Sequence, residues 1–295
     1  VNPTINGVAQ SGYTGFKNHI INGGFDVWQR GTYFSPTTGA QYFSDRWYLD
    51  TTGSSGLVRR VTDQYTSISG ASNAIGININ GASSVQFRTP LENPEKMQNK
   101  TFTLSFYVRG AVATQFEYVG IIFRDGVNSQ ISRLSGVKTI STSYNRVSFT
   151  FDVGDLSSLD MAQTNRNATV VFRIPNGLTT EIFLTNIQLE EGSVATPFEQ
   201  RPYGLELSLC QRYYEVQDTP TMGLSNYNSW ANESQGRIPW KVAKRVPPTV
   251  SGYTVHNGNL IASGFGVYSA YFAMNWTSGN SASISGYLLA DAEIY

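Results

Sequence analysis

The sequence predicts an all-β protein: two sheets packed face to face, followed by a short helix and a smaller β unit. Three observations support this fold class. Apolar and polar side chains alternate along many segments, which is the two-residue period of half-buried strands. Clusters of Gly, Asn, Asp and Pro separate these segments and predict turns. Only 14% of the 295 residues are charged and 28 are glycine, a composition typical of strands joined by polar turns.

Four segments present matching apolar faces, and these define the predicted sandwich. They are Thr101–Arg109, Val119–Arg124, Arg146–Val153 and Thr169–Ile174. Every second residue in each segment is apolar: Phe102, Leu104, Phe106 and Val108; Val119, Ile121 and Phe123; Val147, Phe149, Phe151 and Val153; Val170, Phe172 and Ile174. Two sheets stacked face to face would bury all four sets.

The segment Glu181–Leu189 departs from this simple alternation. Ile182 and Leu184 share one parity, whereas Ile187 and Leu189 share the other. Either a bulge near Thr185 and Asn186 or burial on both faces would explain the change of phase. We expect a central strand that closes the sandwich.

Pro197 and Pro202 mark the predicted domain boundary, because proline cannot donate ladder hydrogen bonds. We therefore expect an N-terminal arm over residues 1–16, a β-sandwich over 17–200, and a helix with a smaller β domain over 201–295.

In the last part, helix-like spacing of apolar residues in Tyr203–Val216 predicts a short helix that runs into a strand. Further on, Asn257 and Gly258 both tolerate positive φ and predict a hairpin between Thr254–His256 and Asn259–Ala262. Strands at Tyr268–Trp276 and Tyr287–Ile294 complete the unit. Lys244 and Arg245, just before a Pro-rich break, are interpreted as a solvated edge, with contact to an acidic or phosphate group of a glycan as the alternative.

Charge and composition exclude several classes of function. Twenty-one basic residues balance twenty-one acidic ones without a basic run, so nucleic-acid binding is not expected. No segment approaches the ~20 consecutive apolar residues of a membrane span, so membrane insertion is not expected either. The single cysteine, Cys210, allows no internal disulfide and no thiolate metal cluster. Val1–Gly15 has neither a basic leader nor an apolar core, so no signal peptide is expected.

Three stretches of the sequence together resemble a known family. They are HIINGGFDVWQRG (His19–Gly31), YFSDRW (Tyr42–Trp47) and TTEIFLTNIQLEEGSVATPFEQRPYGLELSLCQRYY (Thr180–Tyr214). Their order is similar to that in a β-sandwich module of fibre and receptor-binding proteins of tailed bacteriophages. The resemblance extends over roughly the first two thirds of the chain, a length suited to a sandwich of about 180 residues.

The resemblance implies a jelly-roll sandwich similar to carbohydrate-binding modules. It also implies a homotrimer in the phage virion, at a tail or fibre, made in the host cytoplasm. The implied partners are other copies of the chain, other virion proteins, and host surface polysaccharide or lipopolysaccharide. No catalytic motif of an enzyme family is matched.

Exposed aromatic side chains with polar neighbours are the residues that bind sugars in this class. Trp230 lies with Tyr227 and Asn228 in a polar segment, and Trp276 borders another, so these four are the candidate carbohydrate-binding residues. Burial between subunits would explain the same tryptophans equally well. Trp28 and Trp47 lie in the motif segments and are interpreted as packing residues.

No cofactor and no catalytic residue is expected. His19 and His256 lack the spaced partners of a metal site. Because related sugar-binding sandwiches often hold a structural calcium, Asp26 and Glu190 are the candidate oxygen ligands. A plain hydrogen-bonded turn is the alternative for both.

The leading functional hypothesis is therefore a non-catalytic virion protein that adheres to host glycan. A purely structural component of a fibre, baseplate or head decoration is the alternative. A depolymerase is the least supported, because neither β-helix repeats nor an acid pair is recognised in the sequence.

Overall fold

The computed structural model describes residues 16–36, 38–53, 56–62, 68, 71–81, 84–125, 129–160, 167–223, 225–228, 233–276 and 282–293, with only the backbone described for 219–223, 225–228 and 276. Two short paired strands, β1 (Thr4–Ile5) and β2 (Val8–Ala9), are also described. The chain divides into two compact units, residues 1–202 and 203–295.

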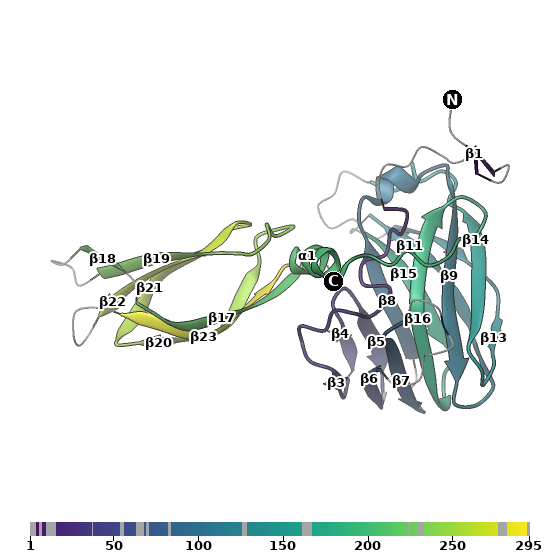
Figure 1. The fold of residues 1–295 in the computed structure, drawn as a ribbon, viewed down its shortest axis with the longest axis horizontal. Helices are drawn as coiled ribbons and strands as arrows, with labels where there is room; N and C mark the ends of the chain where they lie inside the picture. The colour runs from purple at the N-terminus through teal and green to yellow at the C-terminus, as the bar shows by residue number, and fades with distance from the viewer. Residues whose placement is uncertain are drawn as a thin grey trace. The chain divides into compact units, whose positions relative to one another are not determined.

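The first unit is a jelly-roll sandwich of two six-stranded antiparallel sheets (Figure 1). One sheet, here called the front sheet, has the order β12-β11-β15-β8-β5-β4. Its strands are β12 (Gln130–Leu134), β11 (Tyr118–Arg124), β15 (Asn167–Ile174), β8 (Ser84–Leu91), β5 (Tyr48–Thr52) and β4 (Gly39–Tyr42).

The other sheet of the sandwich, here called the back sheet, has the order β14-β9-β16-β7-β6-β3. Its strands are β14 (Asn145–Asp152), β9 (Thr101–Gly110), β16 (Thr179–Glu191), β7 (Ala74–Asn80), β6 (Leu57–Val61) and β3 (Tyr33–Phe34). A third, two-stranded sheet pairs β10 (Thr114–Phe116) with β13 (Lys138–Ile140), and a 3₁₀ helix, η1 (Pro94–Met97), follows β8. The predicted all-β sandwich is confirmed.

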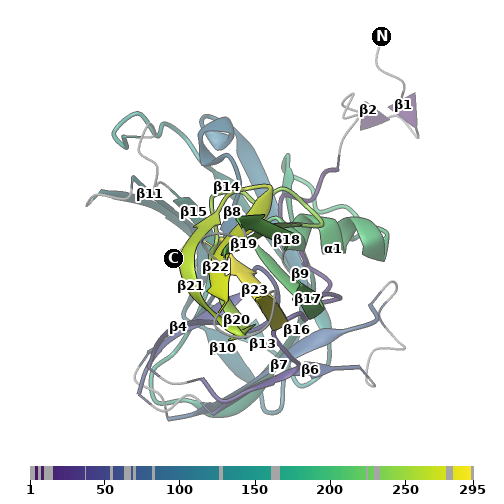
Figure 2. The same cartoon turned by 90° about the vertical axis from the view of Figure 1, so that its left-hand side faces the viewer.

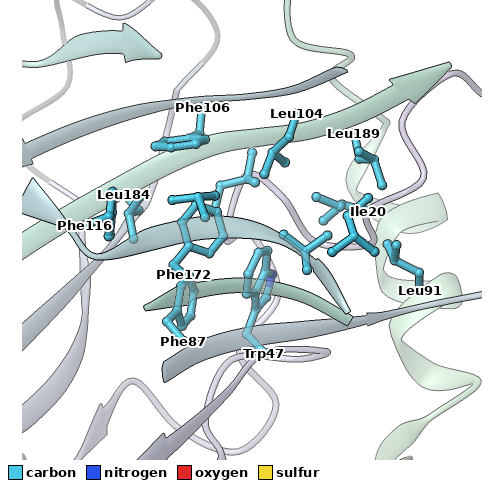
Figure 3. Packing of buried hydrophobic residues seen from close by; sticks show 14 of the residues in the cluster. Ile20, Trp47, Phe87, Leu91, Leu104, Phe106, Phe116, Phe172, Leu184 and Leu189 are labelled. Atoms are coloured by element: carbon cyan, nitrogen blue, oxygen red, sulfur yellow. The ribbon is translucent and has the colours of Figure 1, made fainter. Parts of the chain in front are cut away.

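An aromatic core fills the space between the two sheets. Trp47 stacks on Phe87 with ring centroids 4.5 Å apart, and Phe106 meets the face of Phe172 edge-on at 5.0 Å. Figure 3 shows these side chains between the strands. The inward residues predicted from alternation all pack in or against this core, so the period-two pattern located the buried faces correctly.

Strand β16 has both a bulge and burial on both faces, the two alternatives that its sequence left open. Its pairing with β9 shifts register between Thr185 and Gln188, and Asn186 has a φ of 50°. Every residue from Ile182 to Glu190 is buried. The strand lies inside the back sheet, between β9 and β7. The bulge lets consecutive apolar residues keep contact with the core after the phase changes.

The first sequence motif forms a buried hydrogen-bond network around Asn22. The Asn22 side chain donates to the Val27 carbonyl at 2.8 Å and to the Asp45 carbonyl at 3.0 Å. The backbone carbonyl of Asn22 accepts from the Trp47 indole at 3.0 Å. The two motifs that contain these residues are therefore joined by buried polar groups whose hydrogen bonds are satisfied.

The second unit contains two smaller antiparallel sheets, seen nearly end-on in Figure 2. It begins with α1 (Tyr203–Gln211), which leads into β17 as predicted. The three-stranded sheet has the order β17-β23-β20 and the four-stranded sheet β18-β19-β22-β21. The strands are β17 (Tyr214–Gly223), β18 (Ser225–Asn228), β19 (Glu233–Pro239), β20 (Thr249–His256), β21 (Gly258–Phe265), β22 (Ser269–Trp276) and β23 (Ser283–Asp291). Within the described residues, no helix has the length and hydropathy to span a membrane.

The predicted hairpin at Asn257 and Gly258 is wrong. β20 pairs with β23, whereas β21 pairs with β22, so the chain crosses from one sheet to the other at this point. Asn257 does adopt a positive φ of 57°, and a Cβ on Gly258 would lie 2.1 Å from the Asn275 carbonyl oxygen. The two residues permit a sharp bend, but a bend alone does not make the flanking strands pair with each other.

The interpretation of Lys244 as a solvated edge residue is also wrong. Its ammonium is fully buried and lies 2.6 Å from a Glu215 carboxylate oxygen that is equally buried. The ammonium also donates to the carbonyl of Gln211, the last residue of α1. This contact ties the helix end to β17, a role that only the folded unit reveals.

Candidate binding face on the first unit

The outward side of the front sheet gathers tyrosine, arginine, glutamine and aspartate side chains. Leu49, Phe87 and Ile121 of β5, β8 and β11 point into the core. Because successive residues of a strand point to opposite faces, their neighbours at odd offsets point outward. The outward set is Tyr48, Asp50, Gln86, Arg88, Tyr118 and Arg124. We call this set the Arg–Tyr face.

Strand register makes these residues one surface. Arg88 pairs with Tyr48 of β5, and Gln86 pairs with Asp50 of the same strand. On the other side of β8, Arg88 pairs with Val171 of β15, which in turn pairs with Gly120 of β11. Residues brought from three distant parts of the sequence therefore lie side by side.

Below the polar groups lies a buried floor. Ile122, Thr169 and Val171 are outward residues of the front sheet, yet their exposed fractions are only 5%, 2% and 0%. Outward side chains of a bare sheet would be in contact with water, so longer neighbours cover these three. Tyr42 and Tyr48 extend the floor, with ring centroids 5.1 Å apart.

Arg88 is held in place by its neighbours on the face. Its Nε donates to the Gln86 side-chain oxygen at 3.1 Å, and a terminal nitrogen lies 3.3 Å from an Asp50 carboxylate oxygen. The Arg88 side chain is 13% exposed. An arginine fixed in this way presents its guanidinium in one orientation.

Arg124 differs from Arg88 because no acceptor in the described part of the chain holds it. It is half-buried, and no hydrogen bond or salt bridge joins its guanidinium to a described residue. Burial lowers the pKa of Arg124, the charge of Arg88 lowers it further, and Tyr48, Asp50 and Tyr118 act in the opposite direction. Its N–H donors are therefore available to a bound molecule.

Part of the outward side of the back sheet is covered by the chain itself. Residues 192–199, here called the strap, run along it. Thr103 donates to the Gly192 carbonyl at 2.7 Å, Arg146 donates to the Thr196 carbonyl, and Thr196 donates through its hydroxyl to Glu190 at 2.6 Å. Of the two outer faces of the sandwich, the back one is thus partly covered by the strap, over β14, β9 and β16.

The predicted carbohydrate-binding residues fall mostly outside the described part of the chain. Trp230 lies outside it entirely, and of Tyr227, Asn228 and Trp276 only the backbone is described. Asn228 pairs with Glu233, which pairs with Asn275, the neighbour of Trp276. The backbone therefore brings Asn228 and Trp276 to the same end of the four-stranded sheet. Their role in sugar binding stays a prediction.

The candidate calcium ligands have hydrogen-bonding roles in the structure. Asp26 accepts from the Asn73 side chain at 2.7 Å, and burial raises the pKa of Asp26. Glu190 accepts from the backbone N–H of Thr196 at 2.8 Å and from its hydroxyl. Over the described residues, no group of three or more His, Cys, Asp or Glu side chains is placed to hold a metal ion.

The aromatic and charged residues of the motifs have structural roles. Trp47 is fully buried, and the Trp28 indole donates to the Phe25 carbonyl at 2.7 Å, which confirms both as packing residues. Asp45 accepts from the backbone and the side chain of Gln29 at 2.7 and 2.6 Å. Burial is the largest influence on Asp45 and raises its pKa.

Sequence reasoning missed the Arg–Tyr face because it looked for tryptophan in loops. A signal was present, however. The polar parity of β8 holds Gln86 and Arg88, and that of β11 begins with Tyr118 and ends with Arg124. Polar-facing Tyr, Arg and Gln on several strands of one sheet would have indicated a binding face, but the strand order that joins them is not contained in any single segment.

Comparisons with known proteins give a fold likeness only. No model of a known protein family matches the chain, and no curated protein matches it. One similar solved structure is the enzymatically active domain of bacteriophage CBA120 tailspike protein 4, with 16% identity and a TM-score of 0.39. The match covers 59% of this chain and 21% of the tailspike chain, about a fifth of its length.

Two carbohydrate-binding modules show similar values. The CBM22-1 xylan-binding domain from Paenibacillus barcinonensis is 9% identical with a TM-score of 0.37, covering 61% of this chain and 100% of the module. TmCBM61, solved with β-1,4-galactotriose, is 12% identical with a TM-score of 0.36, covering 60% and 100%. Similarity of this strength transfers neither a ligand nor a site residue to the chain.

Proposed function

We propose that this chain is a non-catalytic glycan-recognition protein of a tailed-phage virion and that it contacts host surface polysaccharide or lipopolysaccharide through the Arg–Tyr face. The single observation that carries the binding role is this face itself. It presents partly buried guanidinium, amide, carboxylate and phenol groups above a buried floor. Sugar hydroxyls are bound by such planar hydrogen-bonding groups, and pyranose C–H faces pack on aromatic rings and guanidinium planes.

The phage context of the proposal comes from the sequence resemblance. The structure supports it in one respect: the motif residues form an internally consistent network. Asn22 joins the first two motifs, and Glu190 holds the strap that belongs to the third. Residues with such roles stabilise the sandwich whatever ligand it binds. The identities of the outward residues can therefore vary with the ligand without loss of the fold.

Assembly into a homotrimer is part of the proposal, with the second unit as the contact between copies. β21 is an edge strand of its sheet, and Leu260 and Ile261 on it are 39% and 52% exposed. An exposed apolar edge strand is a surface on which another chain packs. Several linked copies would convert weak single-site affinity into firm attachment.

The binding role can be tested with the full chain on an array of bacterial surface polysaccharides. We expect binding that is lost in Tyr118→Ala and retained in Tyr268→Ala, since Tyr268 is 74% exposed and lies in the second unit. Loss in Trp230→Ala or Trp276→Ala, with no effect of Tyr118→Ala, would transfer the site to the second unit. No binding to any glycan would favour the purely structural alternative, and shortening of the bound polysaccharide would favour a depolymerase.

The trimer can be tested separately by light scattering after size-exclusion chromatography. The wild-type chain should elute at three times the 32.5 kDa protomer mass. Leu260→Ser with Ile261→Ser should give monomers, because both changes replace exposed apolar groups with polar ones on the edge strand. A wild-type monomer, or an unchanged oligomer in the double variant, would contradict the assignment.

A further inference from the structure

The charges on the Arg–Tyr face are not balanced, and this imbalance restricts the ligand. Three arginines point outward from the front sheet: Arg88, Arg124 and Arg173. Arg88 lies 3.3 Å from Asp50, and Arg173 lies 3.3 Å from Glu117. Within the described residues, Arg124 has no carboxylate at salt-bridge distance.

Arg124 is also placed among groups that make its charge costly in the absence of a ligand. Its guanidinium lies within electrostatic range of Arg88, and its side chain is partly buried. Asp50, the carboxylate of the Arg–Tyr face, already pairs with Arg88. A second cation beside a first, both partly desolvated, favours the arrival of an anion.

The remaining groups on the face show how such an anion would be held. The Arg124 guanidinium offers N–H donors in a planar fork, which matches the two oxygens of a carboxylate or the oxygens of a phosphate or sulfate. Gln86 of β8 and Tyr118 of β11 lie on either side of β15 and have polar ends suited to sugar hydroxyls. Asp50 would repel an anion placed over it, which positions the anionic group on the Arg124 side of the face.

From this arrangement we propose that the glycan recognised at the Arg–Tyr face is acidic and that Arg124 binds its anionic group. The inference rests on the proposed function and deepens it by naming the ligand class: a saccharide that carries a carboxylate, phosphate or sulfate. Arg88, braced by Gln86 and Asp50, sets the positive field, and Arg124 makes the direct contact.

The experiment compares the full chain with three variants of it. Each protein is titrated with three ligands: oligogalacturonate, the same oligosaccharide after its carboxyl groups are reduced to give a neutral sugar, and a sulfated oligosaccharide of equal length. The variants are Arg124→Gln, Arg124→Lys and, as a charge-matched control, Lys96→Gln. Lys96 is exposed on η1 and is not part of a front-sheet strand. Thermal unfolding of each variant shows that the fold is retained.

We expect at least one acidic oligosaccharide to bind about tenfold or more tightly than the neutral one, which is the size of one charge-assisted contact. Arg124→Gln should abolish this preference, Arg124→Lys should retain part of it, and Lys96→Gln should leave it intact. The uronate and sulfate arms show which anionic group is preferred.

Two results would overturn the inference while leaving the proposed function in place. One is equal affinity for neutral and acidic oligosaccharides, and the other is an acidic preference that survives in Arg124→Gln. Binding of none of the oligosaccharides, by contrast, combined with an array on which no glycan binds, would overturn the proposed function itself.

Discussion

At the scale of single residues, the motif glycines and asparagines are explained by space and hydrogen bonding. A Cβ on Gly23 would lie 2.0 Å from the Ile187 carbonyl oxygen, because the two backbones meet where Ile187 donates to Gly23 at 2.9 Å. No side chain movement can relieve a clash with backbone. Asn22 likewise has a φ of 58° that few other residues adopt readily.

Gly23→Ala should therefore destabilise the first unit by about 2–3 kcal/mol, the usual cost of overpacking a closely packed site. Gly136→Ala is the matched control, because a Cβ there meets nothing within 4 Å, and its effect should stay within about 0.5 kcal/mol. Urea unfolding of both variants measures the difference. Equal stability of the two would show that the backbone contact at Gly23 is not closely packed.

His19 gives the first unit a pH dependence. Burial is the main cause that lowers its pKa below the ordinary 6.5, so the unfolded chain takes up the proton at a higher pH than the folded chain does. The contribution of His19 to the free energy of unfolding is therefore fully present above about pH 6.5, and it decreases as the pH falls toward the pKa of the folded state.

The change can be measured as the drop in melting temperature between about pH 7.5 and about pH 5.5, a range that includes the ordinary histidine pKa. His19→Gln loses the edge contact with Phe102 at 5.2 Å and should have a lower melting temperature throughout, but a smaller drop with acid. An equal drop in the variant and the wild type would show that other groups cause the acid sensitivity.

At the scale of secondary structure elements, one buried ion pair holds the end of α1 to β17. Lys244 and Glu215 are both fully buried, and burial is the main cause that lowers the pKa of Lys244, against the opposing effect of Glu215. Removing one partner of such a pair leaves the other charge buried without compensation, which destabilises the fold.

Lys244→Met alone should cost the second unit about 3–5 kcal/mol, whereas Lys244→Met with Glu215→Met should cost less than the single change. Calorimetry of the single and double variants completes the cycle. Simple addition of the two single costs would contradict the pairing.

Elements could be predicted from the sequence where burial sets a regular pattern. Phe102 to Val108 alternate strictly, Val170, Phe172 and Ile174 keep the same two-residue period, and both sets were placed correctly. The hairpin at Asn257 and Gly258 was predicted wrongly because these residue types indicate a bend but do not determine which strands pair. Lys244 misled because a buried charge depends on Glu215, which lies 29 residues away. The Arg–Tyr face was missed for a similar reason, since Arg88 and Arg124 become neighbours only through the order β8-β15-β11.

At the scale of the whole molecule, each unit has a hydrophobic core of its own. A core that is complete within one unit is the condition for independent folding. Residues 17–202 expressed alone should therefore show a cooperative thermal transition and the protected fluorescence of Trp47. A fragment that is unfolded or aggregated would show that the first unit depends on the rest of the chain.

The proposed binding role requires the outward side of the front sheet to be the ligand site. A crystal structure of the full chain with an acidic oligosaccharide tests this most directly. The predicted result is a sugar over Tyr118 with its anionic group within hydrogen-bond distance of the Arg124 guanidinium. A sugar bound instead beside Trp230 or Trp276, with the Arg–Tyr face covered by another chain, would contradict it.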